Sequence, residues 1–153
     1  MPAQKLKSFL DDNKIRYIRI IHSPAYTSQE IAASAHVPGK EMAKTVMVRL
    51  DGNMAMAVLP AMCQVDLEKL REATDAGKAE IATEQEFRDA FPECEVGAMP
   101  PFGNLYGMDV VVDKLLAEDE MVAFNAGSHS ELLKMDFADY QRLVNPAIAD
   151  IAD

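Results

Sequence analysis

Three short stretches hold the residue types most able to do chemistry. Lys44 begins an apolar stretch, residues 97–103 read GAMPPFG, and residues 124–129 read FNAGSH. A lysine ammonium pairs with a carbonyl or phosphate oxygen, and consecutive prolines fix φ and hold the backbone groups of a loop still. Each stretch also has an ordinary structural interpretation. These are a charge at a strand end, a rigid surface turn, and a simple turn after a strand.

The sequence lacks the residue patterns that other common chemistries require. The three histidines, His22, His36 and His129, show no metal-ligand spacing, and neither Cys63 nor Cys94 lies near a histidine in the sequence. The phosphate-binding, dinucleotide-binding and nucleophile-elbow motifs are absent. We therefore expect neither a metal nor a cofactor. The two cysteines are far apart and form no C-x-x-C pair, so we expect reduced thiols.

The length and charge of the chain limit the partners that it can have. The 153 residues are enough for one domain with a hydrophobic core, spanning residues 1–153. The net charge is −10, but residues 1–49 carry +4 and residues 50–153 carry −14. Such a chain cannot coat a long duplex, although it can hold a short nucleic-acid end. With no signal peptide and no membrane-spanning run, we expect a cytoplasmic protein with no membrane partner and no DNA partner.

Helical and strand patterns alternate along the chain. Capping boxes at Thr27–Glu30 and Thr83–Glu86 start helices, and Asp51-Gly52 between two apolar stretches indicates a hairpin. Residues 108–113 are β-branched and apolar, which is typical of a central strand. The expected helices are 4–13, 27–35, 66–73, one from Thr83 that Pro92 ends, and one containing Phe137, Tyr140, Leu143 and Val144. The expected strands are 16–22, 44–50, 53–60, 108–113 and 121–127. This order predicts a mixed sheet and an α/β or α+β class.

Taken together, the three stretches resemble one family. A lysine opens a strand, a G-x-x-P-P-F-G loop follows about fifty residues later, and F-N-A-G-x-H comes about twenty-five residues after that. In order and spacing this resembles the YbaK-like, prolyl-tRNA-synthetase-associated editing domains, over residues 4–146. These domains are free-standing or synthetase-embedded deacylases that hydrolyse mischarged aminoacyl-tRNA. The resemblance implies a mixed α/β sheet that is partly barrel-like, with flanking helices.

The resemblance also implies site residues. Lys44 matches the family's essential lysine, which contacts the tRNA 3′ end or the ester carbonyl. The loop matches the rigid segment that shapes the amino-acid pocket and offers backbone groups to the ester and the α-amine. The strand end matches the segment that closes the pocket, and His129 suits members that handle small side chains such as alanine. The implied catalytic residues are Lys44 and Gly97, and the implied substrate-binding residues are Pro100, Pro101, Phe102, Gly103, Asn125, Gly127 and His129.

A deacylase of this kind can work without a protein nucleophile. The ribose hydroxyl of the terminal adenosine would help to activate the water, and fixed backbone donors would stabilise the charge on the carbonyl oxygen. The predicted partner is the 3′ acceptor end of an aminoacyl-tRNA, with an aminoacyl-tRNA synthetase as a second candidate. Thr45 follows the lysine where some alanine-specific members carry asparagine, so the amino acid stays open. Two other interpretations remain: a binding module that has lost turnover, and a regulatory partner of a synthetase or the ribosome.

Overall fold

The computed structural model describes residues 4–21, 41–92, 94–95 and 98–153. The predicted helix at 27–35, together with Gly97, His22 and His36, lies outside these residues. The helices are α1 (Gln4–Asp12), α3 (Leu67–Thr74), α4 (Glu84–Phe87), α5 (Lys114–Ala117) and α6 (Phe137–Val144), with 3-10 turns η1 (Arg88–Ala90) and η2 (Gly103–Leu105). The strands are β1 (Tyr17–Ile21), β2 (Ala43–Leu50), β3 (Asn53–Pro60), β4 (Ala79–Ile81), β5 (Asp109–Asp113), β6 (Met121–Ser128), β7 (Glu131–Asp136) and β8 (Ala147–Ala149).

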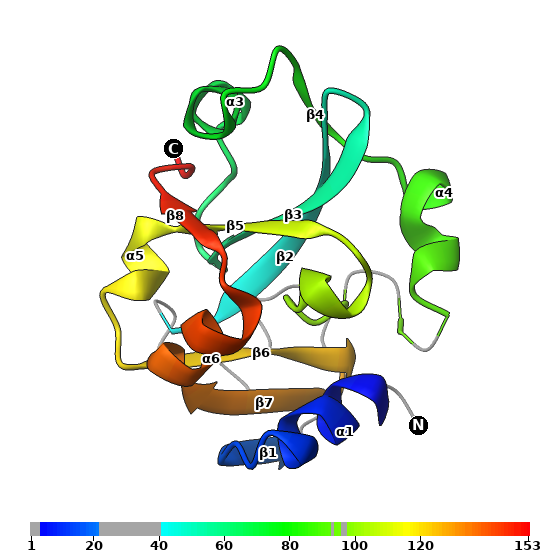
Figure 1. The fold of residues 1–153 in the computed structure, drawn as a ribbon, viewed down its shortest axis with the longest axis vertical. Coiled ribbons are helices and arrows are strands. Elements are labelled where there is room, and N and C mark those ends of the chain that lie inside the picture. Colours follow the sequence, from blue (N-terminus) through cyan, green and yellow to red (C-terminus); the bar gives the residue numbers. More distant parts are fainter. Residues whose placement is uncertain (1–3, 22–40, 93, 96–97) are drawn as a thin grey trace.

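The strands form two sheets (Figure 1). The five-stranded sheet has the order β4-β2-β3-β5-β8 and is mixed: β2 pairs antiparallel with β3 and β4, and β5 pairs parallel with β3 and β8. The smaller sheet, β1-β7-β6, is antiparallel. The mixed α/β prediction is confirmed, as is the hairpin, in which Asp51 and Gly52 both take the positive φ that a type I′ turn needs.

The two sheets meet where β2 begins. Met42 forms a parallel bridge with Ala123 of β6, and the Ala123 amide donates to the Glu41 carbonyl at 2.9 Å. Beside this bridge the ammonium of Lys134 lies 3.3 Å from the carboxylate of Glu41. The start of β2, which carries Lys44, is therefore held against β6.

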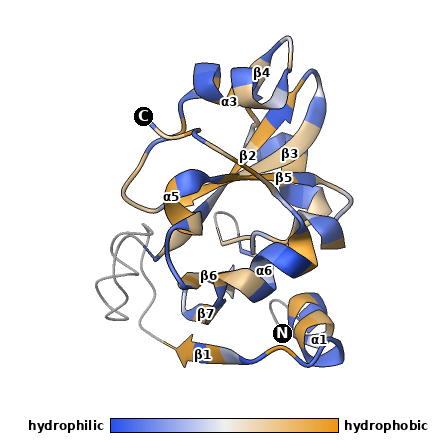
Figure 2. Cartoon of the chain, turned by 60° about the vertical axis from the view of Figure 1, so that its left-hand side comes forward, coloured by the Kyte–Doolittle hydropathy of each residue, from blue (hydrophilic) through white to orange (hydrophobic). Residues whose placement is uncertain are grey.

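The main core lies between the two sheets. Alternate residues of β2, β3 and β5 face the inner side of β6 and β7, and α1 and α6 add apolar residues to the same cluster. The apolar colouring of β3 and β5 in Figure 2 reflects strands that are buried on both faces. A second cluster on the outer face of the large sheet packs under α3 and the C-terminal residues. Within the described residues, no helix is long and apolar enough to cross a membrane.

Most predicted elements in the described residues are confirmed, but some begin or end at other residues than predicted. The capping box at Thr83 is present, but its α-helix ends at Phe87 and continues as a 3-10 turn before Pro92. Strands β4, β7 and β8 and helix α5 had no sequence prediction. Three of these four elements are only three or four residues long, and β7 (ELLKMD) does not alternate apolar with polar residues.

Candidate functional site

The loop that contains the two prolines is anchored by its own aromatic residue. Phe102 is fully buried, and its ring makes edge contacts with Phe9, Phe124 and Tyr140, at centroid distances of 6.3, 5.4 and 5.2 Å. The side chain of Phe102 therefore lies in the core and is closed off from a ligand. Its contribution to a binding site is to hold the adjacent backbone in place.

A buried hydrogen bond fixes the loop at the second proline. The Tyr140 hydroxyl donates to the Pro101 carbonyl at 2.6 Å, and the Phe102 amide donates to the Pro100 carbonyl at 2.8 Å. Burial raises the pKa of Tyr140 well above its ordinary value, so the phenol stays protonated as a donor. The loop backbone is thus tied to α6 as well as to the core.

Gly103 is required by close packing. A Cβ built on it would lie 2.6 Å from both the Met108 carbonyl oxygen and a Val110 methyl carbon, closer than real contacts allow. Gly103 also starts the turn η2, so the irregular loop ends at Phe102 rather than at residue 103. Its position explains the glycine without contact to a substrate.

The loop and the end of β6 are joined by backbone hydrogen bonds. The Gly127 amide donates to the Ala98 carbonyl at 2.8 Å, and the Glu95 amide donates to the Gly127 carbonyl at 2.8 Å. The pairing of β6 with β7 shifts register between Asn125 and Ser128, and Gly127 within that irregularity has φ +88°. A side chain at this φ would be strained. The structure therefore joins two of the three stretches that the sequence singled out.

His129 follows directly in the turn between β6 and β7. It is partly buried, and its amide donates to a carboxylate oxygen of Glu95 at 3.2 Å. Glu95, which stands two residues before the loop, was not predicted as a site residue. The Glu95 amide donates a hydrogen bond to the Gly127 carbonyl, and the Glu95 carboxylate accepts one from the His129 amide. Glu95 therefore links the loop to the end of β6.

Lys44 reaches the same region from β2. It is the second residue of that strand, is partly buried, and lies opposite Leu59 of β3. Lys44 follows Met42 by two residues, and Asn125 follows Ala123 by two. Met42 and Ala123 form the parallel bridge between the sheets. Because side chains alternate along strands, Lys44 and Asn125 lie on the same sides of their strands as this bridged pair. The third stretch thus adjoins the other two.

Cys63, which was not predicted as a site residue, lies close enough to Lys44 for the lysine charge to affect the pKa of its thiol. Burial is the largest effect on Cys63 and raises the pKa of its thiol; the Asp113 carboxylate adds to this rise, and Lys44 opposes it. The thiol is therefore protonated near neutral pH, and a protonated thiol is a poor nucleophile. Both Cys63 and Cys94 are reduced thiols, as predicted. Over the described ranges, no cluster of three or more metal-binding side chains occurs.

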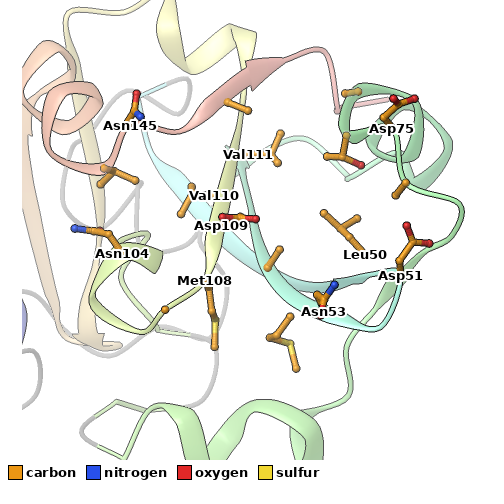
Figure 3. A pocket seen from close by; sticks show the side chains of 18 residues that line it. Leu50, Asp51, Asn53, Asp75, Asn104, Met108, Asp109, Val110, Val111 and Asn145 are labelled. Carbon is orange, nitrogen blue, oxygen red and sulfur yellow. The ribbon is translucent and has the colours of Figure 1, made fainter.

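A separate cavity of about 850 Å³ lies at the other end of β2 (Figure 3). Its floor comes from β3 and β5, and the carboxylates of Asp51, Asp75 and Asp109 lie around it. Of the predicted site residues that the structure describes, none lines this cavity. Asp51 is occupied by structural hydrogen bonds, since its carboxylate accepts from the amides of Gly77 and Lys78. The cavity is therefore distinct from the site at the start of β2.

Comparison with known proteins gives one consistent result. The family model for the aminoacyl-tRNA editing domain matches residues 22–143. The multifunctional Ser/Thr-tRNA deacylase ProXp-y of Escherichia coli (strain K12) is 33% identical over 114 residues, which are 71% of this chain and 67% of the relative. The prolyl-tRNA editing protein ProX of Acetoanaerobium sticklandii is 27% identical over 141 residues, 88% of this chain and 85% of the relative.

A solved structure shares the fold. It has been assigned provisionally as a trans-editing enzyme for prolyl tRNA synthetase, and it superposes with a TM-score of 0.83 at 17% identity. The match covers 99% of this chain and 96% of the other. The two-sheet architecture is therefore that of a known editing-domain fold.

Proposed function

Because the chain belongs to the aminoacyl-tRNA editing domain family and is an editing hydrolase, we propose that it deacylates tRNA mischarged with a small amino acid such as alanine. It acts in trans on the 3′ acceptor end in the cytoplasm. The observation that carries this proposal is the junction of the three stretches. The proline loop is hydrogen-bonded to the end of β6 at Gly127, and Lys44 lies on the neighbouring strand, which bridges β6.

The junction supplies what ester hydrolysis needs. The ammonium of Lys44 stabilises negative charge on the ester carbonyl oxygen or pairs with a phosphate of the 3′ end. The backbone around Gly97 to Pro101 holds the ester and the α-amine. The ribose hydroxyl of the terminal adenosine assists the attacking water. Fixed donors are effective because they need no reorganisation as the charge develops, and the anchoring of Pro101 by Tyr140 supports such rigidity.

The size of the accepted amino acid follows from the same rigidity. A stiff loop that bounds a small pocket would exclude large side chains sterically, whereas it would distinguish small ones from each other only weakly unless a polar group takes part. Alanine is the amino acid that the sequence resemblance favours. ProXp-y, the relative at 33% identity, is named for serine and threonine. We therefore propose a substrate range that includes alanine, serine and threonine.

The direct test is release of amino acid from a panel of mischarged tRNAs. We expect turnover of small aminoacyl esters and slow or absent turnover of bulky ones. In Lys44→Ala, the rate should fall by at least a hundredfold with the fold intact. Lys78→Ala is the matched control, because Lys78 is an exposed lysine next to the far end of the same sheet. Binding of aminoacyl-tRNA without turnover by the unaltered protein would favour the non-catalytic alternative. An unchanged rate in Lys44→Ala would remove Lys44 from the mechanism.

A further inference from the structure

Asn125 carries a buried polar atom that the described residues leave without a hydrogen-bond partner. The residue is 5% exposed, and its Oδ1 atom has no hydrogen-bond partner in the described part of the chain. Leaving a buried acceptor unpaired is costly, and most such groups in proteins have a partner. Among the described residues this acceptor is left open, so it is available to a donor from a bound molecule.

The position of Asn125 points to the substrate as that partner. Its neighbours in sequence, Phe124 and Ala126, face the main core. Asn125 faces the opposite way, on the side of β6 where Ala123 meets Met42 at the start of β2. It also borders the irregular segment of β6 to which the proline loop is joined through Gly127. The unpaired oxygen thus lies at the junction on which the proposed function rests.

The positive charge of Lys44 indicates which kind of donor can bond to the Asn125 oxygen. The α-ammonium of an aminoacyl ester is a poor match for this position, because Lys44 on the adjoining strand already brings a positive charge there and like charges repel. A neutral hydroxyl satisfies the oxygen without adding charge. Given the proposed function, in which the loop holds the α-amine and Lys44 the carbonyl or a phosphate, the substrate group left for Asn125 is the amino-acid side chain. We propose that Asn125 is a specificity-determining residue whose Oδ1 accepts a hydrogen bond from the side-chain hydroxyl of seryl- and threonyl-tRNA.

This role makes selectivity depend on a single atom. A site built to bond a hydroxyl discriminates against the analogue that lacks it, because the buried acceptor is then left unpaired. Seryl esters should be preferred over alanyl esters, and threonyl over valyl, although the members of each pair are close in size. A pocket that sorted by size alone would not separate the members of either pair in this way.

The test compares kcat/KM for seryl- and alanyl-tRNA in the unaltered protein and in two variants. We expect a seryl preference of about tenfold or more in the unaltered protein. Asn125→Leu, similar in size but without an acceptor, should bring the ratio of seryl to alanyl kcat/KM to within about twofold of one. Asn125→Asp, which keeps an acceptor oxygen, should retain the preference. Both kcat/KM values in a ratio are measured on the same protein preparation. A fraction of unfolded protein therefore lowers both values equally and leaves their ratio unchanged.

Failure of this inference is distinguishable from failure of the proposed function. Turnover of both esters with the same ratio in the unaltered protein and in Asn125→Leu would overturn the role of Asn125 and leave the deacylase intact. If the unaltered protein hydrolyses neither ester, the proposed function fails. The inference is then tested by binding of non-hydrolysable 3′-amide analogues of seryl- and alanyl-adenosine. Equal affinities would overturn it, and tighter binding of the seryl analogue that is lost in Asn125→Leu would support it. The same binding measurement decides the matter if either variant fails to fold.

Discussion

Replacing Tyr140 with phenylalanine tests whether the proline loop is held from the core. The change removes one hydroxyl and keeps the ring, so the edge contact with Phe102 at a centroid distance of 5.2 Å survives. What is lost is the 2.6 Å hydrogen bond to the Pro101 carbonyl. Pro101 is itself buried, so its carbonyl is left without that donor, at a cost of about 1–3 kcal/mol. For a domain of this size, this corresponds to a fall in Tm of about 2–12 °C.

Loss of the hydrogen bond should also slow catalysis. The Pro101 carbonyl is one residue from the backbone of Pro100, and a displacement of about 1 Å in a positioned group can lower a rate on the order of a hundredfold. We expect kcat to fall by about tenfold or more while KM changes little. The assay is single-turnover deacylation of alanyl-tRNA, measured well below the Tm of the variant and beside a thermal melt.

The matched control is Tyr17→Phe. The Tyr17 hydroxyl donates to the exposed carboxylate of Asp11 at 3.1 Å, on the outer strand β1. Its loss should change Tm by no more than about 2 °C and leave the rate unaltered. If Tyr140→Phe melts and turns over like the unaltered protein, the hydrogen bond does not hold the loop. If it melts lower but keeps its rate, the loop is held but its position does not limit catalysis.

Alkaline pH gives a second readout of the same group. Burial raises the pKa of the Tyr140 phenol above its unfolded value of about 10. As the pH rises past about 10, the unfolded chain loses this proton first, so the contribution of Tyr140 to stability is present below that pH and declines above it. Above about pH 10, the Tm of Tyr140→Phe should therefore fall less steeply with pH than the Tm of the unaltered protein.

Three further outcomes are expected. Replacing Pro100 and Pro101 together by alanine should change the free energy of unfolding by about 1–2 kcal/mol yet lower deacylation more than it weakens tRNA binding, and unchanged kinetics would make the loop a simple turn. Gly103→Ala should lower the stability by about 1–3 kcal/mol in a denaturant melt, because its Cβ meets a backbone oxygen at 2.6 Å; an unaltered midpoint would contradict this packing. Burial opposes ionisation of Glu131, but its contacts with Lys7 and Arg19 outweigh burial and lower its pKa. Stability from this group is full above the unfolded pKa of about 4.3 and is lost as the pH falls, so Glu131→Gln should flatten the acid side of the stability curve.

The sequence by itself determined the elements whose signals are local. The hairpin at Asp51-Gly52, the capping box at Thr83 and the apolar periodicity of α1 and α6 each depend on residues within a few positions of one another. The sequence also singled out the three stretches of the proposed site, because a lysine can pair with a carbonyl or phosphate oxygen and a double proline holds a loop backbone still. Their order and spacing carried the resemblance to the editing domains, and the family model over residues 22–143 established membership.

Only the tertiary structure decided what these residues touch. No local pattern shows that Gly127 bonds to Ala98, or that the Met42–Ala123 bridge brings Lys44 and Asn125 to one junction, because these pairs are distant in sequence. Likewise, the phenylalanine of the GAMPPFG loop was predicted to bind substrate, but Phe102 is fully buried because residues from α1, β6 and α6 close over it. The unpaired oxygen of Asn125 is the clearest case, since satisfaction of a hydrogen bond depends on every element that packs around it.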